Sequence, residues 1–170
     1  MYDSKKRYVL LPALATIMLV PRPSSAIDLI STNISNASGN CHVTDFSYSQ
    51  QAKYKALALD NVGTSGIFVN CGLLSDESAA GITSLSISVH NQNSVPATVT
   101  CTAVIGTSAS PATYYSKSVG IGPGAENQIT WTAAGDGGGI LFEHPAAITC
   151  ALPGNTGVTT DEVSYAIQLL

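Results

Sequence analysis

Apolar and polar residues alternate in several short stretches of this chain, and turn-forming residues separate those stretches. Successive side chains of a β-strand point to opposite faces, so a period of two predicts strands with one buried face. The strongest alternation predicts strands at Ile67–Leu74, Ser84–His90, Thr98–Ile105, Gln128–Ala133, Ala146–Leu152 and Val163–Leu169. Weaker strands are predicted at Ala56–Val62 and Tyr115–Ile121. Beyond residue 26 no stretch sustains a period of 3.6, so the pattern predicts an all-β fold.

The same alternation predicts which side chains face the core. Trp131 shares its parity with Ile129 and Ala133, so we expect it inside rather than on a ligand-binding surface. Of the adjacent residues Tyr114 and Tyr115, one must face outward. About eight strands, mostly antiparallel, predict two packed sheets, a β-sandwich.

The connections fit this architecture. The segment 91–96 contains an Asn-rich turn and Pro96, and it reads as a hairpin loop between two strong strands. Gly122-Pro123-Gly124 predicts a tight turn. The polar segment 33–40 reads as a loose lead-in to Cys41, and no internal repeat is apparent.

The first 26 residues have the order of features of a secretory signal peptide. A positive region with Lys5, Lys6 and Arg7 precedes a 13-residue apolar run from Tyr8 to Val20, and small residues at 24–26 follow. The run is too short to span a membrane as a helix. We therefore expect cleavage after Ala26, leaving residues 27–170 as a single domain, secreted or periplasmic and not inserted in a membrane.

Export places the four cysteines in an oxidising compartment, where an even number predicts disulfides. Four cysteines allow three pairings. Cys101 and Cys150 lie in mid-strand on apolar faces, so we expect them to meet across the two sheets. Cys41 follows the lead-in and is predicted to pair with Cys71, which also points inward. No Cys-x-x-Cys pair is present to form a zinc site, and no metal or cofactor is predicted.

The charge of the predicted mature chain narrows the choice of partner. Residues 27–170 contain three lysines, no arginine and ten carboxylates, a net charge of −7. Nucleic-acid binding depends on cations that neutralise phosphates, so no nucleic-acid partner is expected. Anionic membrane surfaces are excluded on the same ground.

A search for catalytic residues finds none. The histidines His42, His90 and His144 are isolated and predicted to be solvated at the surface. The acidic pairs Asp76-Glu77 and Asp161-Glu162 are adjacent in sequence, and neighbours on a strand face opposite ways, so they read as loop charge rather than a glycosidase pair. The glycine-rich segment 135–139 has neither the lysine nor the following helix of a phosphate loop, and it predicts a flexible connection.

One surface is a candidate binding site. The outward positions of the predicted central hairpin carry hydroxyl groups in rows, with an exposed tyrosine nearby. This candidate binding face consists of Ser84, Ser86, Ser88, His90, Thr98, Thr100, Thr102 and Tyr114. Such rows are also ordinary on soluble β-sheets, because Ser and Thr tolerate strand geometry.

The stretch from Ser86 to Trp131 resembles bacterial immunoglobulin-like modules of the cell-adhesion-related type. The resemblance rests on the segments Ser88–Asn93, Ala97–Val104 and Gly122–Trp131. It implies an immunoglobulin-like sandwich and carries no catalytic residues. The four cysteines depart from those modules, which mostly lack them. The whole chain is also similar to small exported bacterial proteins of unknown role.

These observations favour a secreted, non-catalytic β-sandwich that acts by binding or as a structural or adhesion module, with a glycan or a protein at the cell surface as partner. A carbohydrate- or surface-recognition module using the Ser/Thr-rich face is the first alternative. A subunit of an extracellular filament is the second, because the chain closes on an apolar strand at 163–170.

Overall fold

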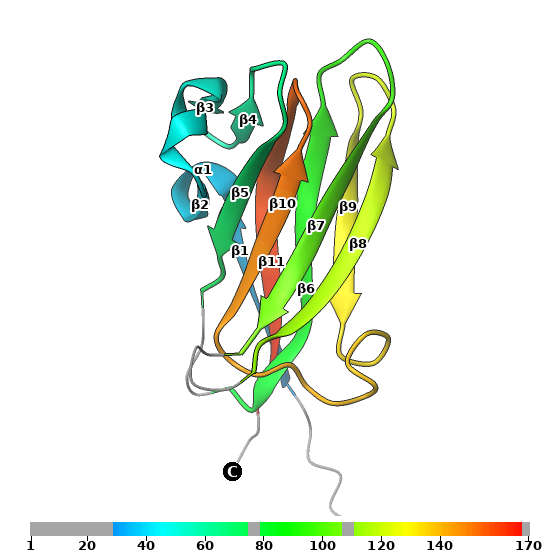
Figure 1. Ribbon diagram of the computed structural model, residues 1–170. Helices are drawn as coiled ribbons and strands as arrows, with labels where there is room; N and C mark the ends of the chain where they lie inside the picture. The colour runs from blue at the N-terminus through cyan, green and yellow to red at the C-terminus, as the bar shows by residue number, and fades with distance from the viewer. Residues whose placement is uncertain (1–28, 75–78, 107–110, 168–170) are drawn as a thin grey trace, which may run out of the picture.

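The computed structural model describes residues 29–74, 79–106 and 111–167, and the predicted signal peptide and Asp76-Glu77 lie outside these ranges. Two antiparallel sheets pack face to face, which confirms the predicted all-β sandwich (Figure 1). The first sheet contains β1 (Leu29–Asn36), β3 (Ala52–Tyr54), β4 (Leu59–Asn61), β6 (Gly81–Asn91), β9 (Glu126–Thr132) and β11 (Thr156–Ile167). The second contains β2 (Cys41–Val43), β5 (Ile67–Gly72), β7 (Ala97–Ile105), β8 (Thr113–Ile121) and β10 (Ala146–Leu152).

The described residues form eleven strands where the sequence predicted about eight. The additional strands come from the polar N-terminal region, so the expected loose lead-in at 33–40 is wrong. Its first half belongs to β1, which pairs with β11 from Leu29↔Ile167 to Asn36↔Thr160, and its second half is the short helix α1 (Ala37–Asn40). A 3-10 helix η1 (Phe46–Gln51) follows. β1 forms because the backbone N–H and C=O groups along the edge of β11 need hydrogen-bond partners. The sequence of β1 itself does not reveal this pairing.

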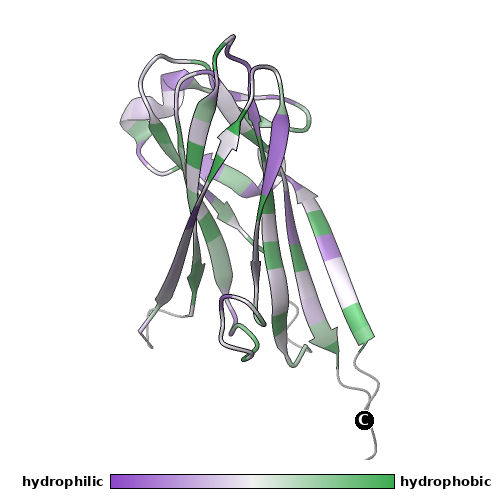
Figure 2. Ribbon diagram, turned by 90° about the vertical axis from the view of Figure 1, so that its right-hand side faces the viewer, coloured by the Kyte–Doolittle hydropathy of each residue, from purple (hydrophilic) through white to green (hydrophobic). Residues whose placement is uncertain are grey.

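The core lies between the sheets and consists of the predicted inward side chains. Banding of apolar and polar residues runs along the strands (Figure 2). The large side chains that are fully buried include Trp131, Tyr165, Leu59, Ile67, Ile82, Leu85, Ile87, Ile148 and Leu152. Over the described residues, each strong alternation in the sequence therefore marked a real buried face.

The pairing of β6 with β7 as a hairpin is wrong. β6 lies between β11 and β9 in one sheet, and β7 lies between β10 and β8 in the other. Asn91, 1% exposed, holds this crossing: its Nδ2 donates to the carbonyls of Val95 (2.8 Å) and Ile121 (3.1 Å). Both strands turn their apolar faces to one interior, so a crossing between layers satisfies the alternation as well as a hairpin would.

The same crossing occurs thirty positions earlier, between β4 and β5. Asn61 takes the place of Asn91, and its Nδ2 donates to the carbonyls of Ser65 (2.7 Å) and Leu152 (2.9 Å). β4 and β6 flank β11 in the first sheet, and β5 and β7 flank β10 in the second. The fold thus contains the same crossing between sheets on either side of β10 and β11, a repetition that the sequence did not predict.

Both predicted disulfide pairings are confirmed, Cys41–Cys71 and Cys101–Cys150. Their placement differs from the prediction. Cys101 lies directly opposite Cys150 on the neighbouring strands β7 and β10, so this bridge lies within the five-stranded sheet rather than across the two sheets. Cys41 lies opposite Cys71 on β2 and β5 in the same way. Side-chain parity places a cysteine inside but does not say which strand lies beside it.

Candidate functional site

The predicted binding face divides between the two outer surfaces of the sandwich. Ser84, Ser86, Ser88 and His90 lie on β6, outside the six-stranded sheet, whereas Thr98, Thr100, Thr102 and Tyr114 lie outside the five-stranded sheet. The two groups cannot contact one ligand together, because the core lies between them. This correction follows from the crossing of the chain between β6 and β7.

The outer surface of the five-stranded sheet carries no charged side chain from β5 to β8. Strand register places the outward residues in rows across four strands. One row is Phe68, Ala151, Thr100 and Ser118, and the next is Asn70, Thr149, Thr102 and Ser116. Lys117, on β8 between Ser116 and Ser118, turns the other way, and its Nζ donates to the carbonyl of Thr130 (2.7 Å) and to Asp136 Oδ2 (2.9 Å).

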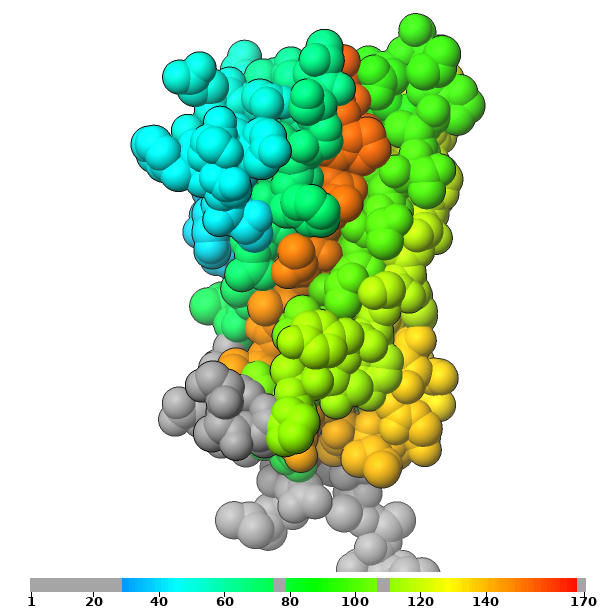
Figure 3. All heavy atoms as spheres, viewed as in Figure 1, coloured from blue at the N-terminus to red at the C-terminus, as the bar shows by residue number. Residues whose placement is uncertain are grey.

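A shallow groove crosses this surface; we call it the sheet groove. One part, of about 280 Å³, is lined by Phe68, Thr100, Thr102, Val104, Tyr114, Thr149 and Ala151. An adjoining part, of about 360 Å³, shares Phe68, Thr100 and Ala151 and continues past Thr98 to Pro153 and Gly154. Figure 3 shows this surface facing the viewer, with β10 (orange) between β5 (blue-green) and β7 (bright green).

Two exposed aromatic rings mark the groove. Phe68 on β5 is 56% exposed and Tyr114 on β8 is 67% exposed, which confirms Tyr114 as the outward member of its pair. The rings stand three strand spacings and four residues apart, a separation on the order of 20 Å. Small side chains fill the floor between them. Phe68 was missed by the sequence analysis, although its parity opposite to Ile67 and Val69 carried the signal.

The hydroxyl groups of the groove are fixed in pairs. Thr100 Oγ1 lies 2.7 Å from Ser118 Oγ, and Thr102 Oγ1 lies 2.7 Å from Ser116 Oγ. A hydroxyl that makes one hydrogen bond keeps capacity for another, because it has one donor and two lone pairs. The surface therefore presents oriented, uncharged hydrogen-bonding groups beside two rings.

The opposite surface differs in character. Ser86 is only 6% exposed and accepts a hydrogen bond from Gln128 Nε2 (3.0 Å). Register places Glu162 beside Ser86 and Glu126 beside His90, so carboxylates interrupt the hydroxyl rows. The outer surface of the six-stranded sheet therefore carries carboxylates beside its hydroxyls, and its predicted site residues include no Phe, Tyr or Trp.

His90 is held by a buried carboxylate, so its predicted role as a solvated surface histidine is wrong. Its Nε2 lies 2.9 Å from Asp60 Oδ1 across Gly157, whose missing side chain leaves room for the contact. Lys55 also pairs with Asp60, and Gln92 Nε2 donates to Asp60 Oδ2 (2.8 Å). Burial opposes ionisation of Asp60, but the hydrogen bonds from Lys55 and Gln92 and the charge of His90 outweigh it and lower the pKa of this carboxyl.

The other two histidines lie apart from His90. His42 is exposed as predicted, whereas His144 stacks on Tyr165 with ring centroids 5.5 Å apart, and both its ring nitrogens are buried without a hydrogen-bond partner. Across residues 29–74, 79–106 and 111–167, no three His, Cys, Asp or Glu side chains gather as metal ligands. Within the same ranges, no helix has the length and apolar character needed to span a membrane.

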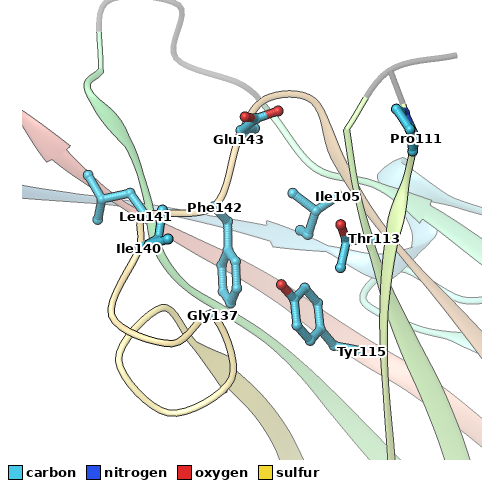
Figure 4. A pocket seen from close by; sticks show the side chains of 9 residues that line it. All are labelled: Ile105, Pro111, Thr113, Tyr115, Gly137, Ile140, Leu141, Phe142 and Glu143. Carbon is cyan, nitrogen blue, oxygen red and sulfur yellow. The ribbon is translucent and has the colours of Figure 1, made fainter. Parts of the chain in front are cut away.

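A second hollow, of about 410 Å³, lies at one end of the sandwich (Figure 4). Its walls are mostly apolar, with Ile105 and Tyr115 on one side and Ile140, Leu141 and Phe142 on the other. The rings of Tyr115 and Phe142 stand 5.3 Å apart between centroids. Glu143 stands at its rim. No sequence motif pointed to this hollow.

Comparisons with known proteins show no family for this chain. No family model and no curated protein matches the chain. Among solved structures it is similar to an exo-β-1,3-galactanase from Phanerochaete chrysosporium with galactose (12% identity, TM-score 0.40), where the match covers 78% of this chain but only 29% of the galactanase chain. It is also similar to a mutant of a family 29 carbohydrate-binding module (12% identity, TM-score 0.43, covering 82% of this chain and 87% of the module).

A third similar structure is the family 11 carbohydrate-binding module from Clostridium thermocellum in complex with a β-1,3-1,4-mixed-linked tetrasaccharide. The identity is 10%, the TM-score is 0.41, and the match covers 84% of this chain and 88% of the module. All three TM-scores lie below 0.5. The function therefore has to be inferred from this chain's own surface.

Proposed function

We propose that this chain is a non-catalytic binding module whose ligand is a neutral, extended glycan lying in the sheet groove. The observation that carries the proposal is the outer surface of the five-stranded sheet, where rows of hydroxyls and two exposed rings occur without a charged side chain from β5 to β8. Phe68 and Tyr114 mark the groove, and Thr100 and Thr102 lie along its floor.

The chemistry of a sugar chain matches these groups. One face of a sugar ring presents C–H groups that pack on an aromatic side chain, which supplies a large apolar contact area. The sugar hydroxyls exchange hydrogen bonds with Thr, Ser and Asn side chains. Binding a neutral ligand at an uncharged surface also avoids the cost of desolvating a charge. A phosphorylated or sulfated ligand would find no cation there.

The groove has no group suited to catalysis. Glycoside hydrolysis needs two carboxyl groups beside the scissile bond, and general acid–base catalysis needs a titratable side chain within hydrogen-bond reach. Neither part of the groove is lined by Asp, Glu, His or Cys. Binding without turnover is the activity that these residues support.

The filament alternative rested on an apolar last strand. β11 lies inside the six-stranded sheet, with β6 on one edge and β1 and β4 on the other. Val163 and Tyr165 are 2% and 0% exposed. A strand that is already paired and buried cannot be donated to a neighbouring subunit, so this observation favours the binding module.

The test is retention on insoluble neutral polysaccharides (cellulose, mannan, β-glucan and galactan), followed by calorimetry with soluble oligosaccharides of the retained type. Phe68→Ala and Tyr114→Ala should each weaken binding about tenfold, which corresponds to about 1.4 kcal/mol. Phe46→Ala and Tyr54→Ala are matched controls, because these rings are 90% and 52% exposed but lie outside the groove, and they should change affinity less than about twofold.

Two results would contradict the proposal. One is unchanged binding in the Phe68→Ala/Tyr114→Ala double variant. The other is retention by charged glycans with none by any neutral polymer. Circular dichroism of each variant checks that the fold is intact.

We further propose that the chain is exported and that its signal peptide is removed after Ala26. The two disulfides support an oxidising compartment. N-terminal sequencing of the exported protein should begin at Ile27. A soluble product that still contains residues 5–20 would refute cleavage.

A further inference from the structure

Strand β1 offers an open edge. It pairs with β11 along its whole length, from Leu29 to Asn36. Its other edge has no strand partner within the described part of the chain. Natural proteins usually protect such an edge with charged residues, proline or a bulge, because its free N–H and C=O groups can pair with another chain. The eight residues of β1, Leu-Ile-Ser-Thr-Asn-Ile-Ser-Asn, include no charge and no proline.

The side chains of β1 make this edge apolar on one face. Ile30 and Ile34 are 67% and 68% exposed, and Thr32 lies between them on the same side. The alternation of apolar and pale polar residues is visible along the strand at the right-hand edge of Figure 2. Covering large, exposed aliphatic side chains with a partner is favourable, because each Å² of apolar surface removed from water stabilises the complex by roughly 25 cal/mol.

The outward face of β1 is symmetric about Thr32 over three residues. Ile30 and Ile34 are two residues away on either side, and the polar residues Ser31 and Asn33 lie between. In an antiparallel pair, side chains of directly opposed residues point to the same face of the sheet. Two copies of β1 centred on Thr32 would therefore place Ile30 of each copy beside Ile34 of the other.

We propose that the protein forms a homodimer in which β1 pairs antiparallel with β1 of a second copy, about a two-fold axis at Thr32. The six-stranded sheets of the two copies then become one continuous sheet. A second copy is the partner that fits, because self-pairing of an antiparallel edge is symmetric and the outward residues Ile30, Thr32 and Ile34 are symmetric in the same register.

Charge also permits this pairing, although residues 27–170 are acidic overall. The outward carboxylate nearest in register is Glu162 on β11, opposite Ile34. In the proposed register the two copies of Glu162 stand three strand spacings and four residues apart, on the order of 20 Å. This separation is about twice the screening length at physiological salt, so the described residues bring no like charges together at the seam.

The oligomeric state and the register can be tested on exported protein from a host that does not attach N-glycans, since Asn33 belongs to an Asn-Ile-Ser sequon. Light scattering coupled to size exclusion should give a dimer that dissociates on dilution. Ile34→Lys should give monomers, because it places a cation at each end of the seam. Val95→Lys, at a 61% exposed position in a loop, should remain dimeric.

Cysteine cross-linking tests the register. Thr32→Cys should form a disulfide-linked dimer under mild oxidation, because directly opposed residues lie close enough for a disulfide. Ile30→Cys should cross-link at least tenfold more slowly, since its opposite residue is Ile34. Monomers at every concentration up to about 1 mM, or equal cross-linking of the two variants, would overturn the proposal; pairing of β1 with a different protein's strand would do the same. Binding to a neutral glycan is measured separately, so that a failure of the proposed dimer can be distinguished from a failure of the proposed function.

Discussion

At the scale of single residues, two buried carboxyl groups in this sandwich have opposite surroundings. Asp60 is fully buried, but it interacts with Lys55, Gln92 and His90. Its pKa is lowered because these interactions outweigh the effect of burial, which raises it. Asp161 is 2% exposed; Asn40 Nδ2 donates to its Oδ2 at 3.3 Å, while its Oδ1 has no hydrogen-bond partner among the described residues. Burial therefore raises the pKa of Asp161. One carboxylate stabilises the fold when ionised, and the other destabilises it.

Replacing each residue by asparagine should change stability in opposite directions. At pH 7, Asp161→Asn should raise the free energy of unfolding by about 1 kcal/mol, because it removes a poorly compensated buried charge. Asp60→Asn should lower it by about 2 kcal/mol, a value reduced from that of a fully buried pair because Lys55 remains exposed. Urea unfolding of the oxidised protein measures both values.

The pH dependence gives a second check on the same pair. The folded-state pKa of Asp161 exceeds its unfolded value of about 3.9, so its contribution to stability falls as pH rises from there through the folded pKa. The folded-state pKa of Asp60 is depressed, so its contribution is present above about pH 3.9 and is lost as pH falls through the folded value. The differences in the free energy of unfolding between each variant and the wild type should therefore become smaller in acid. Glu143→Gln, at an exposed position, serves as the control, and a stabilising Asp60→Asn would refute this account.

The alternation of residues predicted which face of a strand a side chain occupies, but not which residue it contacts on another strand. The alternation placed Trp131 inside and Tyr114 outside, because those statements depend only on a strand having two faces. It could not predict that His90 meets Asp60. That contact depends on β4 and β6 flanking β11 and on Gly157 leaving space between them.

At the scale of elements, the sequence located most strands but not their neighbours. β6 and β7 are consecutive, strongly alternating and separated by a turn sequence, yet they lie in different sheets. The deciding interactions are hydrogen bonds from Asn91 to carbonyls in the turn and at the end of β8. Val95 lies in the adjacent turn, but Ile121 is 30 positions from Asn91 in the sequence, so no local pattern reveals that second contact. β1 escaped prediction for a related reason, since its role is to pair with β11.

The position of the two disulfides predicts unequal effects on stability. Cys101–Cys150 joins two central strands of the five-stranded sheet and closes a loop of 49 residues, while Cys41–Cys71 ties the three-residue strand β2 to β5 across 30 residues. Each loop predicts roughly 3–4 kcal/mol by chain entropy. Because both cysteines of the first bridge are fully buried, Cys101→Ala/Cys150→Ala should destabilise the protein more than Cys41→Ala/Cys71→Ala.

Thermal melting of the two double variants tests the order, and hydrogen exchange tests its cause. Loss of the Cys41–Cys71 bridge should increase exchange in β2 while β10 stays protected. If the Cys41–Cys71 variant has the lower melting temperature, then anchoring of the N-terminal region, and not the centre of the sheet, limits stability.

At the scale of the whole molecule, the proposed groove and the proposed dimer bear on each other. Antiparallel pairing through β1 uses a two-fold axis perpendicular to the six-stranded sheet, because opposed side chains must share a face. This axis leaves the five-stranded sheets of both copies on one side of the dimer. A dimer would thus present two sheet grooves to the same polysaccharide surface, and binding at the second groove would become intramolecular.

This arrangement predicts that the dimer affects binding to a polymer and leaves binding to a short ligand unchanged. The monomeric variant Ile34→Lys keeps every residue of the groove, so its affinity for an oligosaccharide that fills one groove should stay within about twofold of wild type. Its retention on the insoluble polysaccharide should fall about tenfold or more, because the second groove no longer acts at high effective concentration. Tyr114→Ala should weaken both measurements, since it removes a ring from each groove. Calorimetry and depletion assays on the same samples separate the two cases. Equal loss of both kinds of binding in Ile34→Lys would mean that the β1 edge supports the groove itself and not its pairing.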